Sequence, residues 1–350
     1  MKTETIHGGD IYRNQVELDF SVNRNPFGVP RRVKEALEDA IQEVEAYPDI
    51  QYASLRSALS DALGIPEEWI VAGNGASELF LAIVHGLKPE EILIPVPSFY
   101  GYEWAAGASD AVITYYKMKD LCLGEDFLPV LSETGAGLLF LANPNNPVGN
   151  LLSPGLLREI LSICKSRGIV LVVDECFLEF VPENEKYSLI SSLKQYENLI
   201  VVRAFTKLYA IPGVRLGYLL CAGEEIRGRI QRHLPEWNLS LFAERAGVAA
   251  LKETAYVKRT VDFLETERAY LTERLRHLGI IVYESRADYL LLQTKLPLYE
   301  ELLQRGILIR DCRNYRGLGA GYYRVAVRLR EENDRLLAAV SACVEEKEKQ

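Results

Sequence analysis

The chain has 350 residues, of which 48% are hydrophobic and 25% charged, and its net charge is −9. This composition is typical of a globular protein with an ample core. The negative net charge argues against a nucleic-acid partner. The sequence has neither a long apolar run nor the apolar core of a signal peptide, which predicts a cytoplasmic protein outside any membrane. Six scattered cysteines without a C-x-x-C pair and four dispersed histidines predict reduced thiols, with neither a disulfide framework nor a metal site.

Helical patterns alternate with short apolar runs over the first two thirds of the chain. The predicted elements are a helix at 30–44, a helix at 55–63, a strand at 69–72, a helix at 77–85, a strand at 91–94, a helix at 100–106, a strand at 138–141, a helix at 154–166, a strand at 169–173 and a strand at 198–202. The strand segments are continuously apolar rather than alternating. They therefore predict a mostly parallel sheet with helices on its faces.

The last third of the chain has a different organisation. A long helical region at 242–278 precedes short predicted strands at 280–283, 289–292, 307–309 and 323–327, and a closing helix at 331–345. This order predicts a smaller α+β domain. We expect an α/β protein whose large domain spans 46–240, with a small domain built from 1–45 together with 241–350.

Two strand ends in the large domain are followed by segments suited to a ligand. Ligands of open parallel sheets bind beyond the carboxyl ends of the strands. After the strand at 69–72, Gly73-Asn-Gly-Ala-Ser-Glu78 opens a helix whose first amides can bind an anion. After the strand at 138–141, Asn143-Pro-Asn-Asn-Pro-Val-Gly149 projects Asn146 from the sheet. Ordinary turns are the alternative for each segment taken alone.

Two further strand ends carry a carboxylate and a lysine. Asp174 follows five apolar residues, where a charge needs a partner such as a protonated ring nitrogen, a structural ion pair or a helix cap. Lys207 lies at the mouth of a buried strand, which favours its neutral, nucleophilic amine. Thr206 and Arg215 beside it can hold a phosphate, so the group suits a Schiff base with pyridoxal phosphate (PLP). A solvated lysine and a surface arginine are the alternative for this segment alone.

At these residues the chain resembles the fold-type I PLP enzymes of the class I and II aminotransferase superfamily, over nearly its whole length. The resemblance implies the aspartate aminotransferase-like fold and PLP as cofactor, with Lys207 attached to PLP and Asp174 paired with its ring nitrogen. Phe99 would stack on the ring and Asn146 would reach its phenolic oxygen. The remaining implied cofactor contacts are Gly75, Ala76, Ser77, Thr206 and Arg215, and Tyr52 of a partner subunit, which implies a homodimer.

The resemblance also implies residues on the substrate side. Arg324 takes the place of the arginine that binds the substrate α-carboxylate, for which a bidentate fork is suited. The other implied substrate contacts are Asn23, Asn25, His7 and Arg328. Arg24 and Arg313 depart from the pattern of the relatives, and they either add positive charge to the site for a substrate phosphate or are solvated.

Two relatives within the superfamily compete. Asn143-Pro-Asn-Asn-Pro147, Tyr47-Pro-Asp49 and Arg330-Glu-Glu-Asn333 are similar to histidinol-phosphate aminotransferases. The segments that resemble the L-threonine O-3-phosphate decarboxylases of cobalamin biosynthesis are 7–9, 19–23, 25–28, 204–213, 235–238, 308–312 and 324–328. Phe177 also stands where most aminotransferases have a tyrosine. We expect the decarboxylase, which gives aminopropanol phosphate, with an aminotransferase as the alternative and an inactive PLP-fold binding module as a third hypothesis.

Overall fold

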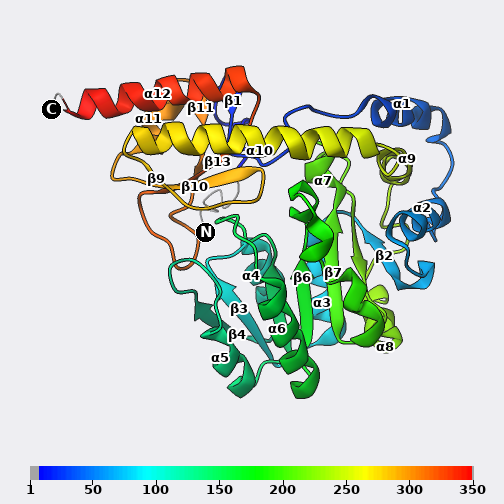
Figure 1. The fold of residues 1–350 in the computed structure, drawn as a ribbon. Coiled ribbons are helices and arrows are strands. Elements are labelled where there is room, and N and C mark those ends of the chain that lie inside the picture. The colour runs from blue at the N-terminus through cyan, green and yellow to red at the C-terminus, as the bar shows by residue number, and fades with distance from the viewer. Residues whose placement is uncertain (1–7, 349–350) are drawn as a thin grey trace.

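Figure 1 shows the computed structural model of the chain, which describes residues 8–348. Its centre is a seven-stranded sheet in the order β2-β8-β7-β6-β5-β3-β4. The strands are β2 (Ile70–Gly73), β3 (Glu91–Val96), β4 (Val112–Lys117), β5 (Leu138–Ala142), β6 (Val170–Asp174), β7 (Leu199–Ala204) and β8 (Gly217–Leu220). Only β8 runs antiparallel to its neighbours. The predicted mostly parallel sheet is therefore confirmed.

The strands of this sheet are apolar throughout because helices bury both of its faces. Leu171 and Val173 of β6 belong to one hydrophobic cluster, whereas Val172 between them belongs to the other. The helices whose side chains join the Val172 cluster are α3 (Ala76–Leu87), α4 (Tyr100–Gly107) and α8 (Glu224–Gln231). The opposite cluster includes α2 (Ala53–Leu63), α5 (Phe127–Glu133) and α6 (Pro154–Arg167). Continuous apolar strands thus follow from two-sided burial.

The predicted helical region at 242–278 is two helices, which corrects the sequence-based expectation of one. α9 (Leu241–Ala250) ends before a turn, and α10 (Thr254–His277) starts after it. α9 packs on α2 and on α1 (Arg31–Ala40), whereas α10 packs on α12 (Arg330–Glu348) and the small sheet. One straight helix cannot contact both sets of partners, so tertiary packing decides this break.

The C-terminal part forms two small sheets. One is parallel and pairs β1 (Leu18–Asp19) with β11 (Ile307–Leu308), which joins the N-terminal segment to the C-terminal part. The other has the order β12-β13-β10-β9. Its strands are β12 (Arg310–Asp311), β13 (Tyr322–Ala326), β10 (Tyr289–Gln293) and β9 (Ile281–Val282), and α11 (Leu298–Gln304) precedes β11.

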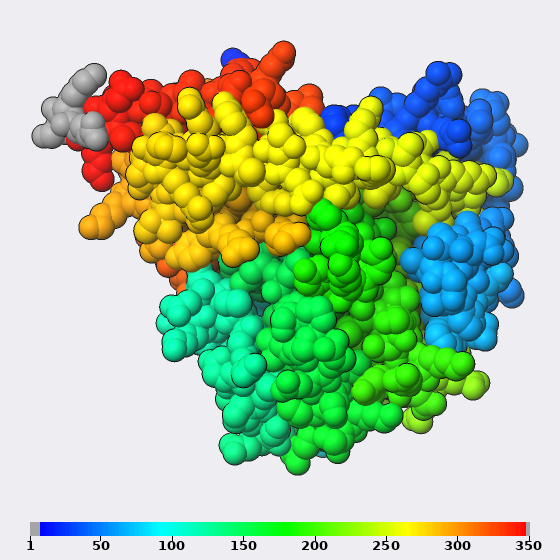
Figure 2. Space-filling view, viewed as in Figure 1, coloured from blue at the N-terminus to red at the C-terminus, as the bar shows by residue number. Residues whose placement is uncertain are grey.

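The two parts of the molecule pack directly against each other. One hydrophobic cluster includes Leu18, Val173 and Leu290, which come from three different sheets. Figures 1 and 2 show α10 lying across the upper edge of the large sheet, with α12 above it. That upper edge carries the carboxyl ends of the parallel strands. Within residues 8–348, no helix is both long and apolar enough to cross a bilayer.

Candidate active site at the carboxyl edge of the large sheet

Lys207 lies on the one-turn helix α7 (Phe205–Leu208), which begins where β7 ends (Figure 1). Its Nζ donates a hydrogen bond to Thr206 Oγ1 at 2.9 Å. Burial is the main cause that lowers the pKa of Lys207. The titratable groups that act on it come from three segments of the chain, which are Asp174 with Cys176 at the end of β6, Arg215, and Asp288. A lysine with a lowered pKa supplies the neutral amine that attack on an aldehyde requires.

The first turn of α3 and the guanidinium of Arg215 form a concave anion cradle, which we define as Gly75, Ala76, Ser77, Thr206 and Arg215. Gly75 has φ +78°, which favours glycine, and a Cβ there would lie 2.5 Å from Arg215 Nη2. A Cβ at Gly217 of β8 would lie 2.7 Å from the Ala76 amide nitrogen. Two glycines therefore allow Arg215 and β8 to approach the free amides at the start of α3, where an anion is favoured.

The carboxylate of Asp174 has two donors at the end of β6. Tyr102 Oη donates to Oδ2 at 2.5 Å, and the Cys176 amide donates to Oδ1 at 2.9 Å. Tyr102 is fully buried and stacks on Phe140 with ring centres 5.1 Å apart. Burial, followed by the charge of Asp174, raises the pKa of Tyr102 well above its usual value, so its hydroxyl stays protonated and donates. A carboxylate held in this way is suited to pair with a protonated ring nitrogen.

Arg324 of β13 reaches from the small sheet to the large domain. Its Nη1 donates to Asn146 Oδ1 at 2.5 Å, and its Nη2 donates to the carbonyl of Ser21 at 3.2 Å. The guanidinium carbon lies 5.2 Å from the centre of the Tyr289 ring. Asn146 Nδ2 donates to no residue within 8–348, so this N–H is available to a ligand oxygen. The structure thus brings Asn146 and Arg324 together, while the cofactor and substrate roles implied for them stay predictions.

Asn25 and Asn23 take different places in the N-terminal segment. The Asn25 amide donates to the carbonyl of Lys207 at 3.0 Å, and its Nδ2 donates to Leu208 O and Thr260 Oγ1. Asn25 therefore holds α7 in place, and a contact with substrate stays a prediction. Asn23 is buried, and its Oδ1 accepts no hydrogen bond from the described part of the chain. That oxygen is available to a ligand donor.

Three aromatic residues complete the surroundings of the cofactor site. Phe99 precedes α4 and meets the Tyr102 ring edge-on, with ring centres 5.6 Å apart. Phe177 meets the Tyr289 ring edge-on at 5.1 Å, and it brings no hydroxyl to the site. Tyr52 Oη accepts a hydrogen bond from the Ala72 amide at 3.2 Å, at the end of β2. The role of Tyr52 across a subunit boundary stays a prediction.

The predicted cations of the substrate side are not all placed together. His7 lies outside the described residues, and Arg24 is exposed. Arg313 forms ion pairs with Glu300 and Asp311 at the surface.

Arg328 and Arg310 are both buried cations of the C-terminal part. Arg328 Nη2 pairs with Glu332 of α12 at 2.7 Å. Arg310 was not predicted. It lies directly opposite Arg324 in the β12–β13 ladder, and it is 7% exposed. Directly opposed residues of neighbouring strands place their side chains on the same face. Arg310 also donates to the carbonyl of Asp311 and to Asn314 Oδ1, so two buried arginines on one face are present for a ligand with two anionic groups.

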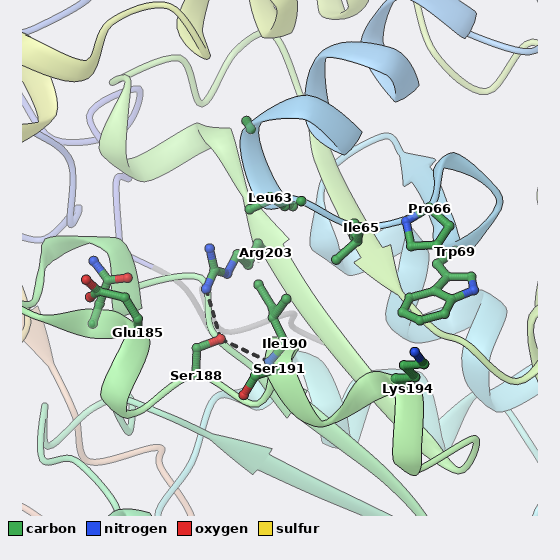
Figure 3. A pocket seen from close by; sticks show the side chains of 13 residues that line it. Leu63, Ile65, Pro66, Trp69, Glu185, Ser188, Ile190, Ser191, Lys194 and Arg203 are labelled. Carbon is green, nitrogen blue, oxygen red and sulfur yellow. Dashed lines mark hydrogen bonds between the residues drawn. The ribbon is translucent and has the colours of Figure 1, made fainter.

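A separate pocket of about 700 Å³ lies between the end of α2 and the segment 184–194, with Arg203 of β7 in its lining. Figure 3 shows Leu63, Ile65 and Trp69 on one side of it and Arg203 and Ser188 on the other. Arg203 Nη2 donates to Ser188 Oγ at 3.1 Å and pairs with Glu175 at 2.8 Å. The pocket has none of the predicted site residues in its lining. Among its polar residues, Arg203 and Ser188 both bond to Glu175, which connects the ends of β6 and β7.

Comparison with known proteins shows the family to which the chain belongs. A model of the family "Aminotransferase class I and II" matches residues 15–340. The chain belongs to this family. It is 39% identical to the threonine-phosphate decarboxylase of Salmonella typhimurium, over 96% of each chain. It is 34% identical to histidinol-phosphate aminotransferase 2 of Archaeoglobus fulgidus, over 92% of each chain. The histidinol-phosphate aminotransferase structure from Clostridium acetobutylicum aligns with a TM-score of 0.87 and 31% identity, covering 94% of this chain and 99% of that one.

Membership in the family confirms the predicted fold type and the predicted cofactor, PLP. The side chains present fit this group. Half-buried Lys207 supplies an amine of lowered pKa, the anion cradle supplies amides and a guanidinium for a phosphate, and Asp174 supplies a held carboxylate for the ring nitrogen. Its relatives are decarboxylases and aminotransferases. The individual residue roles stay proposals, which the experiments below test.

Proposed function

We propose that this protein is a PLP-dependent lyase that decarboxylates L-threonine O-3-phosphate to aminopropanol phosphate. The observation that carries the proposal is the likeness to the Salmonella typhimurium decarboxylase, which is 39% over nearly the full length, against 34% for the Archaeoglobus fulgidus aminotransferase. Phe177 adds support, because a phenylalanine cannot donate the hydrogen bond that a tyrosine gives to the cofactor in most aminotransferases. The products would be consumed in cobalamin biosynthesis.

The side chains around Lys207 would divide the chemistry as follows. PLP, when bound, supplies an electron sink for the bond that breaks at the substrate Cα. Lys207 would hold the cofactor and release it to the substrate amine, while Asp174, held by Tyr102, would keep the ring nitrogen protonated. After CO₂ leaves, the Lys207 ammonium or a water would return one proton to Cα. The proton replaces the lost carboxylate, so the reaction balances.

Arg324 would decide which bond at Cα breaks. The bond perpendicular to the cofactor ring is the one weakened, so the group that orients the carboxylate selects between decarboxylation and transamination. Arg324 is held by Asn146 Oδ1 and by the carbonyl of Ser21, which limits the directions that its fork can take. Arg310, opposite it in the ladder, is our candidate for the substrate phosphate. Asn23 Oδ1 would accept from a substrate donor.

We also propose a homodimer in which Tyr52 of one subunit reaches the cofactor phosphate of the other. The segment before Tyr52 exposes apolar side chains, with Ile41 56%, Val44 53% and Tyr47 83% exposed. The Tyr47 ring contacts the exposed ring of Trp237 at 5.2 Å between centres. A contiguous apolar surface of this kind is typical of an interface. Sedimentation analysis should give a dimer, and Tyr47→Glu should shift the population toward monomer.

The reaction itself is tested by offering both substrates to the purified protein with PLP. L-Threonine O-3-phosphate should release CO₂ and aminopropanol phosphate. Histidinol phosphate with 2-oxoglutarate should give no glutamate. Lys207→Ala should abolish both the visible absorbance of bound PLP and the release of CO₂, because it removes the attached amine. Glutamate formation without CO₂ would instead establish the aminotransferase.

An aminotransferase acting on histidinol phosphate is the second candidate. It is favoured by the TM-score of 0.87 with the Clostridium acetobutylicum structure, at 31% identity. An inactive PLP-fold binding module is a third, and the lowered pKa of Lys207 argues against it, since a binding role does not need a reactive amine.

A further inference from the structure

Asp288 is a buried acid that neither the fold nor the proposed reaction explains. It lies just before β10 and is 0% exposed. Neither carboxyl oxygen has a hydrogen-bond partner within residues 8–348. A buried carboxyl without a partner is unfavourable, and native proteins rarely keep one without a use. The position of this group therefore has to be explained by what surrounds it.

The backbone around Asp288 is held firmly against the site. The Asp288 carbonyl accepts from the Val327 amide at 2.7 Å, immediately beyond β13. The hydroxyl of the next residue, Tyr289, donates to the carbonyl of Asn145 at 2.7 Å. These two bonds attach the segment to the strand that carries Arg324 and to the loop that carries Asn146. The carboxyl of Asp288 is thus held relative to both groups by the fold.

Three cations act on Asp288 from three different elements. They are Arg324 on β13, Lys207 on α7 and Arg268 on α10, and the charge of Asp288 in turn raises the pKa of the adjacent Tyr289 phenol. None of the three cations forms a direct ion pair with Asp288 among the described residues. Arg324 Nε is likewise buried without a partner. The Asp288 carboxyl and the Arg324 guanidinium therefore interact electrostatically without a direct hydrogen bond between them.

The balance of these influences leaves Asp288 able to change charge near neutral pH. Burial raises the pKa of Asp288 to about 7, although Arg324, Lys207 and Arg268 act in the opposite direction. When neutral, the carboxyl leaves the full charge of Arg324 available to an anion. When ionised, it offsets part of that charge at a buried site, where electrostatic interactions are poorly screened.

We propose that Asp288 is a positioning residue that sets, through Arg324, how strongly the site binds the carboxylate of its substrate. The inference rests on the proposed role of Arg324. Ionised Asp288 weakens binding of the carboxylate and protonated Asp288 strengthens it. Because linkage is reciprocal, binding of a carboxylate raises the pKa of Asp288 and draws a proton from solvent.

The test uses two probes that cannot react with the cofactor because they have no amine. One is 3-phosphoglycerate, which has a phosphate and a carboxylate. The other is glycerol 3-phosphate, which has the phosphate alone. The ratio of their dissociation constants on the holoenzyme, measured by calorimetry at pH 6 and pH 8, reports the preference for a carboxylate. Titration of the probe phosphate is common to both probes and cancels in the ratio.

We expect the carboxylate preference of the wild type to fall about five- to tenfold from pH 6 to pH 8. In Asp288→Asn the preference should stay high and change less than about twofold, because the amide does not ionise. Glu300→Gln neutralises an exposed acid on α11 and should show the same pH dependence of the carboxylate preference as the wild type. Wild-type protein should also take up more protons with 3-phosphoglycerate than with glycerol 3-phosphate, which buffers of different ionisation enthalpy measure without any variant.

Three results would overturn the proposal. Equal pH dependence in the wild type and Asp288→Asn would show that another group is responsible. A wild-type preference that does not change with pH, without differential proton uptake, would show that Asp288 is not coupled to Arg324. The absence of any carboxylate preference at both pH values would overturn the role of Arg324 itself, and Arg324→Gln would then match the wild type. Only this last result bears on the proposed function.

Discussion

Tyr102→Phe removes one oxygen atom from the site and tests whether Asp174 depends on it. Tyr102 Oη is buried and donates to Asp174 Oδ2 at 2.5 Å. A hydrogen bond to a charged group contributes about 1.5–3 kcal/mol, so we expect the free energy of unfolding of the apoprotein to fall by about 2 kcal/mol. The ring itself is retained, and its stacking on Phe140 at 5.1 Å should persist. Urea unfolding measures this loss.

Tyr116→Phe provides a matched control. Tyr116 Oη also donates to a carboxylate, Asp126 Oδ2, at 2.7 Å, but this bond is exposed. Water replaces an exposed partner readily, so the loss there should be below about 0.5 kcal/mol. The two variants delete the same atom from the same kind of bond. They differ only in burial and in proximity to the cofactor site.

The same pair of variants separates a cofactor role from a structural one. If Tyr102 holds the carboxylate that pairs with the PLP ring nitrogen, Tyr102→Phe should weaken PLP binding about tenfold, which corresponds to about 1.4 kcal/mol. Tyr116→Phe should bind PLP like the wild type. Titration followed by visible absorbance measures both. Equal losses of stability in the two variants, or unchanged PLP binding in Tyr102→Phe, would refute the proposed link between Tyr102 and Asp174.

Three further changes have expected outcomes. Gly75→Ala places a Cβ 2.5 Å from a guanidinium nitrogen of Arg215 in the anion cradle, so it should weaken PLP binding by about tenfold or more in absorbance titrations. Gly64→Ala is the control, because Gly64 also has a positive φ but has open space around it. It should lower the free energy of unfolding by about 1–2 kcal/mol and leave PLP binding unchanged. Glu175→Gln leaves the buried guanidinium of Arg203 without a counter-charge and should lower the unfolding free energy by about 3 kcal/mol in urea. The pKa of Asp288 is raised from 3.8 to about 7, so stability is lost as pH rises through that window, and Asp288→Asn should stabilise the apoprotein by about 2–4 kcal/mol more at pH 8 than at pH 4 in thermal unfolding.

Buried strands were the elements that could be predicted most directly. Residues 138–141 and 169–173 are continuously apolar, and both are central strands, β5 and β6. β4 was not predicted, because its side chains are partly or fully exposed and its sequence lacks a continuous apolar run. β8 was not predicted either. It follows the Arg215 segment closely, and only pairing with β2 and β7 makes it a strand.

The reactive residues at the strand ends could be predicted from local sequence, but the residues that contact them could not. Asp174 and Lys207 each come directly after a buried strand, so their positions at the carboxyl edge could be inferred. Nothing local marks Tyr102 as the residue that meets Asp174, because the two are 72 positions apart. Arg310 and Asp288 are similar cases. Each lies near the proposed site only because the small sheets pack against the large sheet in the folded chain.

The sequence by itself determined the sheet type, the covering helices α2, α3, α4 and α6, and the residues at the carboxyl edge of the sheet, because apolar periodicity and strand-end residues are local properties. The tertiary structure alone decided which hydroxyl holds Asp174, that Asn25 serves α7, and that Asp288 lies unpaired among three cations. Those arrangements depend on burial and on charges brought together from distant segments. Burial removes the water that would otherwise screen these charges, so the interactions between them are strong only in the folded chain.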